Sequence, residues 1–194
     1  MRWKRWEIAL AASLLVAVLM CSVPIRAQNQ LAEKLVRLHV LANSDSEADQ
    51  QLKLTVRDAV LQAADGAGEI DDTLLYRLQQ TARETIEKEG YAYPVTVTRE
   101  RTWFDTRRYE TFSLPAGYYD AVRVVIGEGE GRNWWCVIYP PLCAGVCEEE
   151  LADIAKEFSL SEEEISLICE EDGYIIRFKL ADLWGKLLHK VYQI

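Results

Sequence analysis

Histidine, the side chain used most often for acid–base catalysis, is scarce in this chain. It has only two histidines, His39 and His189, and Ser44 and Asp45 follow the first of them closely. A hydrolase needs an exposed nucleophile within hydrogen-bond reach of a base. Ser44 is expected to cap a helix, and a capping hydroxyl is committed to backbone amides. We therefore predict no catalytic residue.

Four cysteines, Cys136, Cys143, Cys147 and Cys169, lie in the last 60 residues of the chain. Their spacing does not match the paired C-x-x-C arrangement of zinc sites, so we predict no metal site and no cofactor. In an exported protein an even number of cysteines is compatible with disulfides. A bridge from Cys136 to Cys143 would stabilise the fold by about 2.5 kcal/mol through chain entropy. Cys147 and Cys169 form a less favoured second pair, and the sequence does not choose among the three pairings.

Two acidic features resemble catalytic or phosphate-binding motifs only superficially. The segment GEGEG (127–131) lacks the lysine and hydroxyl of a phosphate loop, and Glu128 and Glu130 would repel phosphate. We interpret it as a hairpin loop. The carboxylate runs 148–150, 162–164 and 170–172 are expected at helix starts, where they favour the helix dipole and stay solvated rather than form a glycosidase pair.

The segment NWWCVIYPPLC (133–143) concentrates the bulky and stiff residues. Trp134 and Trp135 are neighbours, so in a strand they point to opposite faces. Each can bury roughly 150–250 Å². One is expected in the core, and the other is either covered by a helix or left as a binding surface. Pro140 and Pro141 would stiffen the loop that follows.

The N-terminus indicates export. An apolar run, Ile8–Val23, follows three basic residues and ends at Pro24, which is the layout of a secretory signal. Its 16 residues fall short of the ~20 that a transmembrane helix needs. Positive charge before the run would keep the N-terminus in the cytoplasm and send the rest outward.

Cleavage is expected near Ala27, so residues 1–27 are predicted to be a signal peptide or an uncleaved signal anchor. The second reading stays open because Ile25 stands where a small residue is expected. A lipid anchor on Cys21 is disfavoured by Met20. Without residues 1–27, which hold four positive charges and one negative, the formal charge goes from -9 to -12. Such a chain would repel nucleic acid and anionic lipid.

The remainder, residues 28–194, is predicted to be a single α+β domain. Residues 34–45 alternate like a strand, and helices are expected over 44–63 and from Asp71 or Asp72 to Lys88. Strand patterns follow at 94–100, 121–126 and 133–139. Beyond them we expect helices at 147–158 and 160–171, the second opened by a capping box of Ser161 and Glu164, then a strand at 173–180 and a last helix at 181–192. This order favours a mostly antiparallel sheet with helices packed on it.

Three strings carry a family resemblance: VRLHVLANSDSEADQQLKLTVRDAV (36–60), LPAGYYDAVRVVIGEGEGRNWWCVIYPPLC (114–143) and IRFKLADLW (176–184). With them, the chain resembles the stage II sporulation protein R family. Tyr139 departs from the phenylalanine expected there, and Cys147 and Cys169 are extra.

The resemblance implies a signalling role in endospore-forming bacteria. Members are made in the forespore and exported into the space between its two membranes. There they activate a membrane-embedded aspartic protease of the mother cell, which processes the precursor of sigma-E. Members are not known as enzymes, and no small-molecule substrate is expected. Positions in the family strings are candidate contacts with the protease: Arg37, His39, Asn43, Asp45, Arg57, Asn133, Trp134 and Trp135.

Two other functions stay open at this point. One is an extracytoplasmic hydrolase of peptide or cell-wall bonds, built on His39 with Asp45 or a thiol; loss of function in a folded His39→Ala variant without a binding defect would favour it. The other is a glycan-binding module that uses exposed tryptophan faces, and retention on purified peptidoglycan would favour that one.

Overall fold

The structure is a computed structural model that describes residues 28–67, 70–109, 112–142, 153–154 and 156–168, with positions 4, 6, 10, 12, 13 and 186. Several predictions concern residues outside this set. They are the cleavage point at Ala27, most of the apolar run, the partner cysteines Cys143, Cys147 and Cys169, and the elements predicted beyond residue 170. Within the described part, no helix combines the length and the apolar character that crossing a bilayer requires.

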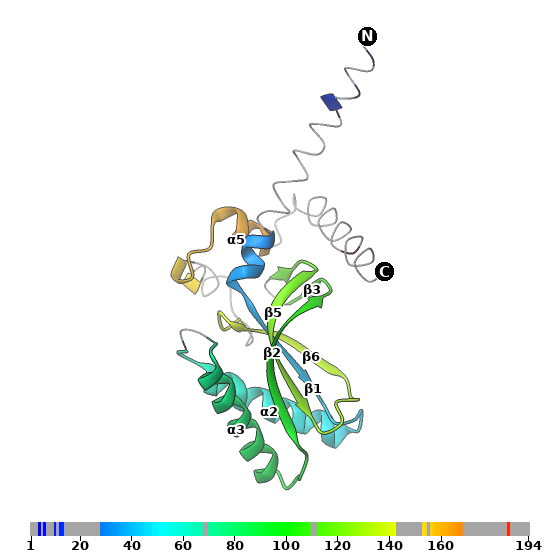
Figure 1. The fold of residues 1–194 in the computed structure, drawn as a ribbon, viewed down its shortest axis with the longest axis vertical. Helices are drawn as coiled ribbons and strands as arrows, with labels where there is room; N and C mark the ends of the chain where they lie inside the picture. Colours follow the sequence, from blue (N-terminus) through cyan, green and yellow to red (C-terminus); the bar gives the residue numbers. More distant parts are fainter. Residues whose placement is uncertain are drawn as a thin grey trace. The chain divides into compact units, whose positions relative to one another are not determined.

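The centre of the fold is a four-stranded sheet (Figure 1). Its strands are β1 (Val36–Leu41), β2 (Val95–Phe104), β5 (Gly117–Ile126) and β6 (Asn133–Tyr139), in the order β2-β5-β1-β6. β1 is parallel to β5 and antiparallel to β6. Pro94, just before β2, accepts a hydrogen bond through its carbonyl from the amide of Gly127, just after β5, at 2.8 Å. The start of β2 therefore lies beside the end of β5, so the two strands are antiparallel. The predicted α+β fold with a mostly antiparallel sheet is confirmed.

The strand order corrects one prediction. Segment 127–132 was expected to be a hairpin loop between paired strands, but β1 lies between β5 and β6. The segment therefore crosses over the end of β1, a span of two strand spacings or about 10 Å. We call it the crossover loop. A local pattern of glycines and strands cannot reveal that a third strand, from far earlier in the chain, occupies the position between them.

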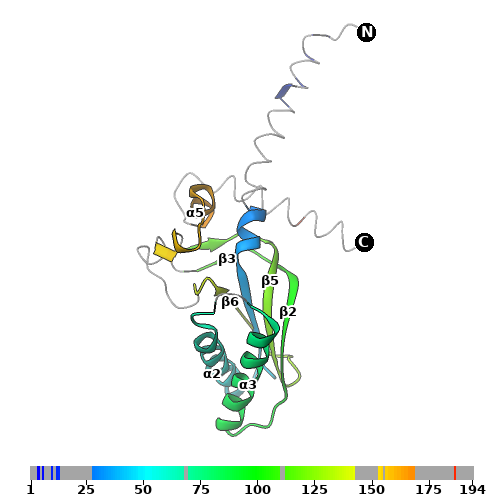
Figure 2. The same ribbon diagram turned by 60° about the vertical axis from the view of Figure 1, so that its left-hand side comes forward.

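Helices α2 (Glu47–Ala64) and α3 (Asp72–Lys88) lie together on one side of the sheet (Figures 1 and 2). The Asp71 carboxylate caps α3 by accepting from Leu74 N at 2.8 Å, and the helix begins at Asp72, one of its two predicted starts. The cap of α2 is Ser46, which accepts from Asp49 N at 3.2 Å, and not Ser44. The predicted cap was wrong by two residues because the Ser44 hydroxyl bonds to the Asp49 side chain instead.

The core lies between these helices and the sheet. The predicted apolar face of β1 is confirmed, because Leu38 and Val40 are fully buried there. The helical stripes that meet it include Val56 and Val60 of α2 and Leu78 of α3. Strand alternation then places the odd-numbered residues of β1 on the other face of the sheet.

Contacts along the chain divide the fold into two compact units. One comprises residues 34–102 and 119–146, and it holds α2, α3 and most of the sheet. The other comprises residues 1–33, 103–118 and 147–194. It contains the short pair β3 (Arg107–Arg108) and β4 (Ser113–Leu114), with helix α5 (Glu162–Ile168). The predicted capping box of α5 is confirmed by reciprocal bonds between Ser161 and Glu164 at 2.6 and 3.2 Å.

Candidate functional site

All eight candidate contact residues lie in the unit that holds the sheet, but the structure does not bring them into one surface. Asn43 and Asp45 lie at the end of β1 against the crossover loop, and Arg57 and Trp134 lie on the helical side of the sheet. The others, Arg37, His39, Asn133 and Trp135, come from β1 and β6. Their positions decide which of them can meet a partner.

The crossover loop lies tightly against the end of β1. Gly131 N donates to Ala42 O at 2.9 Å, and Glu128 N donates to Asn43 Oδ1 at 3.1 Å. A Cβ at Gly131 would lie 2.2 Å from Ser44 O, and one at Gly127 would lie 2.1 Å from Asn43 Oδ1. Glycine is required at both positions because a side chain would occupy space already filled. The glycines thus shape a crossing, not a phosphate site.

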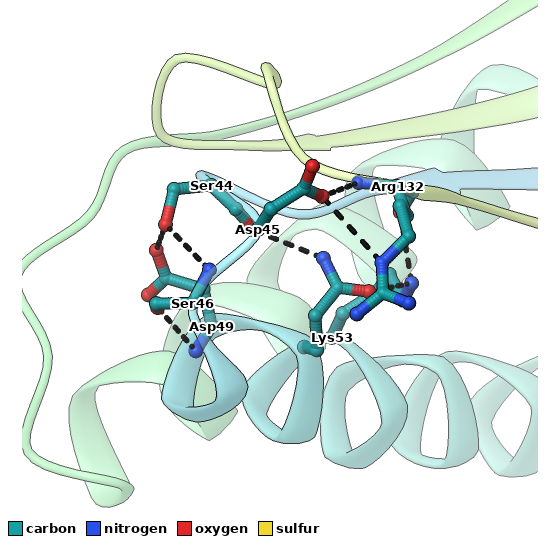
Figure 3. Close-up of polar contacts among 7 residues, drawn as sticks. Ser44, Asp45, Ser46, Asp49, Lys53 and Arg132 are labelled. Carbon is teal, nitrogen blue, oxygen red and sulfur yellow. Dashed lines mark hydrogen bonds and ion pairs between the residues drawn. The ribbon is translucent and has the colours of Figure 1, made fainter.

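A polar network joins this crossing to the first turn of α2 (Figure 3). Asp49, only 4% exposed, accepts from Ser44 Oγ at 2.5 Å and from Asn43 Nδ2 at 2.9 Å. These hydrogen bonds, the one from Ser44 foremost, lower the pKa of Asp49. Asp45 accepts from Arg132 N at 2.7 Å. Asn43 and Asp45 therefore hold the loops together. This structural role is an alternative to the predicted role in partner contact.

Lys53 completes the network from the second turn of α2. Its ammonium donates to Gln50 Oε1 at 2.7 Å and to Arg132 O at 2.8 Å. The side chain is 4% exposed, and its burial, with a smaller effect from the charge of Arg132, lowers its pKa. Sequence reasoning missed both Asp49 and Lys53, although their spacing of four places them on the buried stripe of the helix.

Arg57 and Trp134 face each other across the sheet–helix interface. The Arg57 guanidinium lies 4.3 Å from the centre of the Trp134 ring, a cation–π contact, and it also pairs with Asp58 at 2.7 Å. The Trp134 ring packs against the core. Of the two tryptophans, Trp134 is thus the one that belongs to the core side.

A row of four side chains crosses the other face of the sheet: Glu100 of β2, Arg123 of β5, His39 of β1 and Trp135 of β6. The strand register sets His39 opposite both Arg123 and Trp135. The His39 and Trp135 rings stack with their centres 3.7 Å apart, and Arg123 lies 3.8 Å from the Glu100 carboxylate. We call this set the cross-strand row.

His39 is held as a neutral ring within this row. Its Nε2 is 2.8 Å from Asn133 Oδ1. Burial, and secondarily the charge of Arg123, lowers the pKa of His39 to about 4, against the opposing effect of the Asn133 hydrogen bond. The structure pairs His39 with Asn133, whereas Ser44 bonds to Asp49 and Asp45 to Arg132. The geometry therefore does not bring His39 together with the serine or the aspartate that hydrolysis would use.

Arg37 is fully buried beneath the end of β6. Its Nε donates to Cys136 O at 3.2 Å, and its guanidinium lies 5.2 Å from the Tyr119 ring centre. In this structure Arg37 supports the sheet and does not present a surface to a partner. Cys136 is buried on the core side, and its predicted bridge to Cys143 stays a prediction because Cys143 lies outside the described residues. Among the described residues, no three His, Cys, Asp or Glu side chains are grouped to hold a metal.

A family model described as "Stage II sporulation protein R" matches residues 32–149. This stretch includes the whole four-stranded sheet, α2, α3, the crossover loop and the cross-strand row. The chain belongs to the stage II sporulation protein R family. A curated relative, "Stage II sporulation protein R" of Bacillus subtilis (strain 168), is 37% identical over 131 residues, which cover 61% of this chain and 58% of the relative. No solved structure matches.

The two longest family strings, 36–60 and 114–143, both contribute to the place where the crossover loop passes the end of β1. The string that contains GEGEG and the string that contains NSDS are far apart in sequence, yet they meet at the end of β1. The resemblance seen in the sequence is therefore confirmed, and its two longest strings meet in one substructure of this family member.

Proposed function

We propose that this member of the stage II sporulation protein R family is an exported signal that activates a membrane-embedded aspartic protease by contact. In this proposal the forespore makes the protein and the mother cell carries the protease, which then processes the sigma-E precursor. The observation that carries the proposal is the family match over residues 32–149. The protein would work without a cofactor or a small-molecule substrate.

A non-catalytic mode of action is supported by the positions of the groups that catalysis would need. His39 is stacked on Trp135 and is neutral at physiological pH because its pKa lies near 4. The Ser44 hydroxyl and the Asp45 carboxylate are each bonded within the loop network. In this proposal the protein acts through its surface, and a few buried or half-buried anchors would supply most of the binding energy.

The cross-strand row supports a location for part of that surface. Asn133 is exposed, Trp135 is half-buried and the Arg123 side chain is 38% exposed. Large aromatic and arginine side chains are the residue types that dominate binding energy at protein interfaces. Of the eight candidate positions, we therefore retain Asn133 and Trp135 as contacts, and we assign structural roles to the other six, which include the buried His39.

The proposal is tested by following sigma-E precursor processing with an immunoblot in sporulating cells. A strain without this chain should accumulate the precursor, and the full-length gene should restore processing. A variant lacking residues 2–27 should fail to restore it, whereas the same variant behind an unrelated secretory signal should succeed. Timely processing in the deletion strain contradicts the activator role, and rescue by the variant without any signal contradicts export.

A matched pair of surface variants tests whether contact is the mechanism. Asn133→Ala and Trp135→Ala should lower processing while the purified proteins stay folded, because both side chains lie in the retained contact set. Arg83→Ala on α3, whose side chain is 65% exposed, is the control and should process normally. Normal processing in both variants would remove Asn133 and Trp135 from the contact surface.

A further inference from the structure

β2 is an outer strand of the sheet, because among the described strands it has a neighbour, β5, on one side only (Figure 2). The direction of its backbone groups can be deduced. Pro94 O bonds to Gly127 N, so the groups of residue 94 point toward β5. In an antiparallel pair, groups of alternate residues point the same way. The backbone N–H and C=O groups of residues 96, 98, 100 and 102 therefore face β5. Those of residues 95, 97, 99 and 101 point away from the sheet.

An independent contact supports this assignment. Val97 N donates to the Gln79 side chain of α3 at 3.3 Å, which is possible only if this amide points away from β5. Gln79 thus covers the outer edge at Val97. Further along, no group in the described part of the chain bonds to the outward N–H and C=O of Arg99 and Arg101. The N–H and C=O groups of these two residues can therefore hydrogen-bond to an added strand.

A groove of ≈ 790 Å³ lies beside this stretch. It is lined by Ile70, Asp71, Asp72 and Leu75 around the start of α3, by residues 97–101 of β2 and by Asp120 of β5. The Arg99 guanidinium is already used, since it donates to Ile70 O at 2.9 Å and to Asp120 Oδ2 at 2.7 Å. Of the carboxylates in the lining, Asp71 caps α3, Asp120 pairs with Arg99 and Arg101, and Glu100 pairs with Arg123. Asp72 is the lining carboxylate that a cationic side chain of a partner would complement.

We propose that the outer edge of β2 at Arg99–Arg101 binds an extended basic segment, which adds to the sheet as a fifth strand. Main-chain hydrogen bonds to Arg99 and Arg101 would hold the segment, and a lysine or arginine of the segment would lie over the groove beside Asp72. Strand addition of this kind derives affinity from the backbone and specificity from alternate side chains. That the segment belongs to the activated protease rests on the proposed function.

A second copy of this chain is a poorer occupant. Pairing two β2 edges would bring the Arg99 and Arg101 guanidinium groups of both copies together. Each copy also carries a formal charge of -9, so the approach of two copies is opposed over a long range. Charged side chains on an outer strand are a common way to prevent such self-association.

Proline substitutions test the backbone directly in the full-length chain. Arg101→Pro removes an outward N–H, which an outer strand tolerates, and should lower processing at least tenfold. Arg101→Ala keeps that N–H, so it should lower processing less than threefold. Glu100→Pro removes an N–H that faces β5, so it should unfold the sheet and serves as the folding control. Asp72→Lys should lower processing severalfold by reversing the charge in the groove.

Photocrosslinking gives a second readout that does not depend on a folded proline variant. A benzoylphenylalanine at Thr98, an exposed residue of β2 beside the proposed pairing stretch, should form an adduct with the protease in sporulating cells. The same group at Tyr76, which is 68% exposed on α3, is the control and should form none. An adduct between two copies of this chain, or no adduct at Thr98, overturns the proposal.

The outcomes separate this inference from the proposed function. If the deletion strain processes the precursor, the proposed function fails. If the deletion strain does not process it but Arg101→Pro, folded by circular dichroism, processes it normally, then only the strand-addition site fails.

Discussion

His39 and Trp135 stack face to face across β1 and β6, with their ring centres 3.7 Å apart and their planes at 17°. The register puts them directly opposite each other. Because the ring stack and burial exclude water from the imidazole, protonation is disfavoured and the pKa of His39 falls to about 4. The pair therefore makes the stability of the fold sensitive to acid.

We expect the free energy of unfolding to fall by about 2 kcal/mol between pH 7.5 and pH 4.5 through His39 alone, after allowance for its partial exposure. The folded pKa lies below the unfolded value of 6.5, so the unfolded state binds the proton first between pH 6.5 and 4. The neutral His39 ring therefore contributes its full stabilisation above pH 6.5, and this stabilisation is lost as the pH falls from 6.5 to 4. Urea denaturation of the wild type and His39→Gln at both pH values measures the difference; equal pH dependence in the two proteins would contradict it.

Gly131→Ala should lower the free energy of unfolding by about 3 kcal/mol, because the added Cβ would lie 2.2 Å from the Ser44 carbonyl oxygen. Gly90→Ala is the matched control. Gly90 has a positive φ of 85° but open space around its Cβ position, so only the backbone strain of about 1 kcal/mol applies. Denaturant titration of both variants tests the order, and a smaller loss at Gly131 than at Gly90 would show that the crossover loop is free to move.

Asp49→Ala should cost about 2–3 kcal/mol, since it leaves the buried Ser44 hydroxyl and the Asn43 amide without their acceptor. Because the folded pKa of Asp49 is lowered, its contribution is present near neutral pH and is lost as acid protonates the folded form. Asp58→Ala, at a carboxylate that is 64% exposed, should change stability by less than about 0.5 kcal/mol. Similar losses at the two positions would mean that the loop network does not stabilise the fold.

Arg57 and Trp134 should be coupled energetically. A double-mutant cycle with Arg57→Ala and Trp134→Phe is expected to give a coupling free energy of about 0.5–1 kcal/mol, because the guanidinium lies over the ring. A cycle on the surface pair Arg83 and Glu87 is the control and should give no more than about 0.5 kcal/mol. A coupling free energy of zero would show that the contact between Arg57 and Trp134 does not stabilise the fold.

The predicted bridge between Cys136 and Cys143 can be tested on protein recovered from outside the cytoplasm. In denaturant without a reductant, both thiols should resist alkylation, and mass spectrometry should find one peptide pair joined by a disulfide. Cys143→Ser should then cost about 2.5 kcal/mol through the lost loop constraint. Alkylation of Cys136 without reduction, or a pair that joins Cys136 to Cys147, would contradict this pairing.

The sequence predicted those features that depend on neighbouring residues. The stripes of α2 and α3, the alternation of β1 and the Ser161–Glu164 capping box depend on residues two to four positions apart, and the structure has all of them. The position of β1 between β5 and β6 depends on pairings between residues about 85–100 positions apart, which no local pattern specifies.

The candidate site was harder to predict for a related reason. Charged side chains are usually exposed, so Arg37 and Lys53 gave no signal that they would be buried. Their partners are mainly backbone carbonyls, of Cys136 and Arg132, which every residue type provides. The two longest family strings lie within the stretch that the family model matches, but they could not separate the side chains that hold the fold from those that face outward.

The central position of β1 has a consequence for the timing of folding. β1 ends at Leu41, yet both its neighbours are made much later, and Val36 pairs with Tyr139. A chain that emerges N-terminus first cannot assemble this sheet until most of it has been synthesised, and such distant pairings form slowly. The sheet of the growing polypeptide therefore stays incomplete for a long interval, and a chain without its finished sheet is easier to thread through a narrow pore.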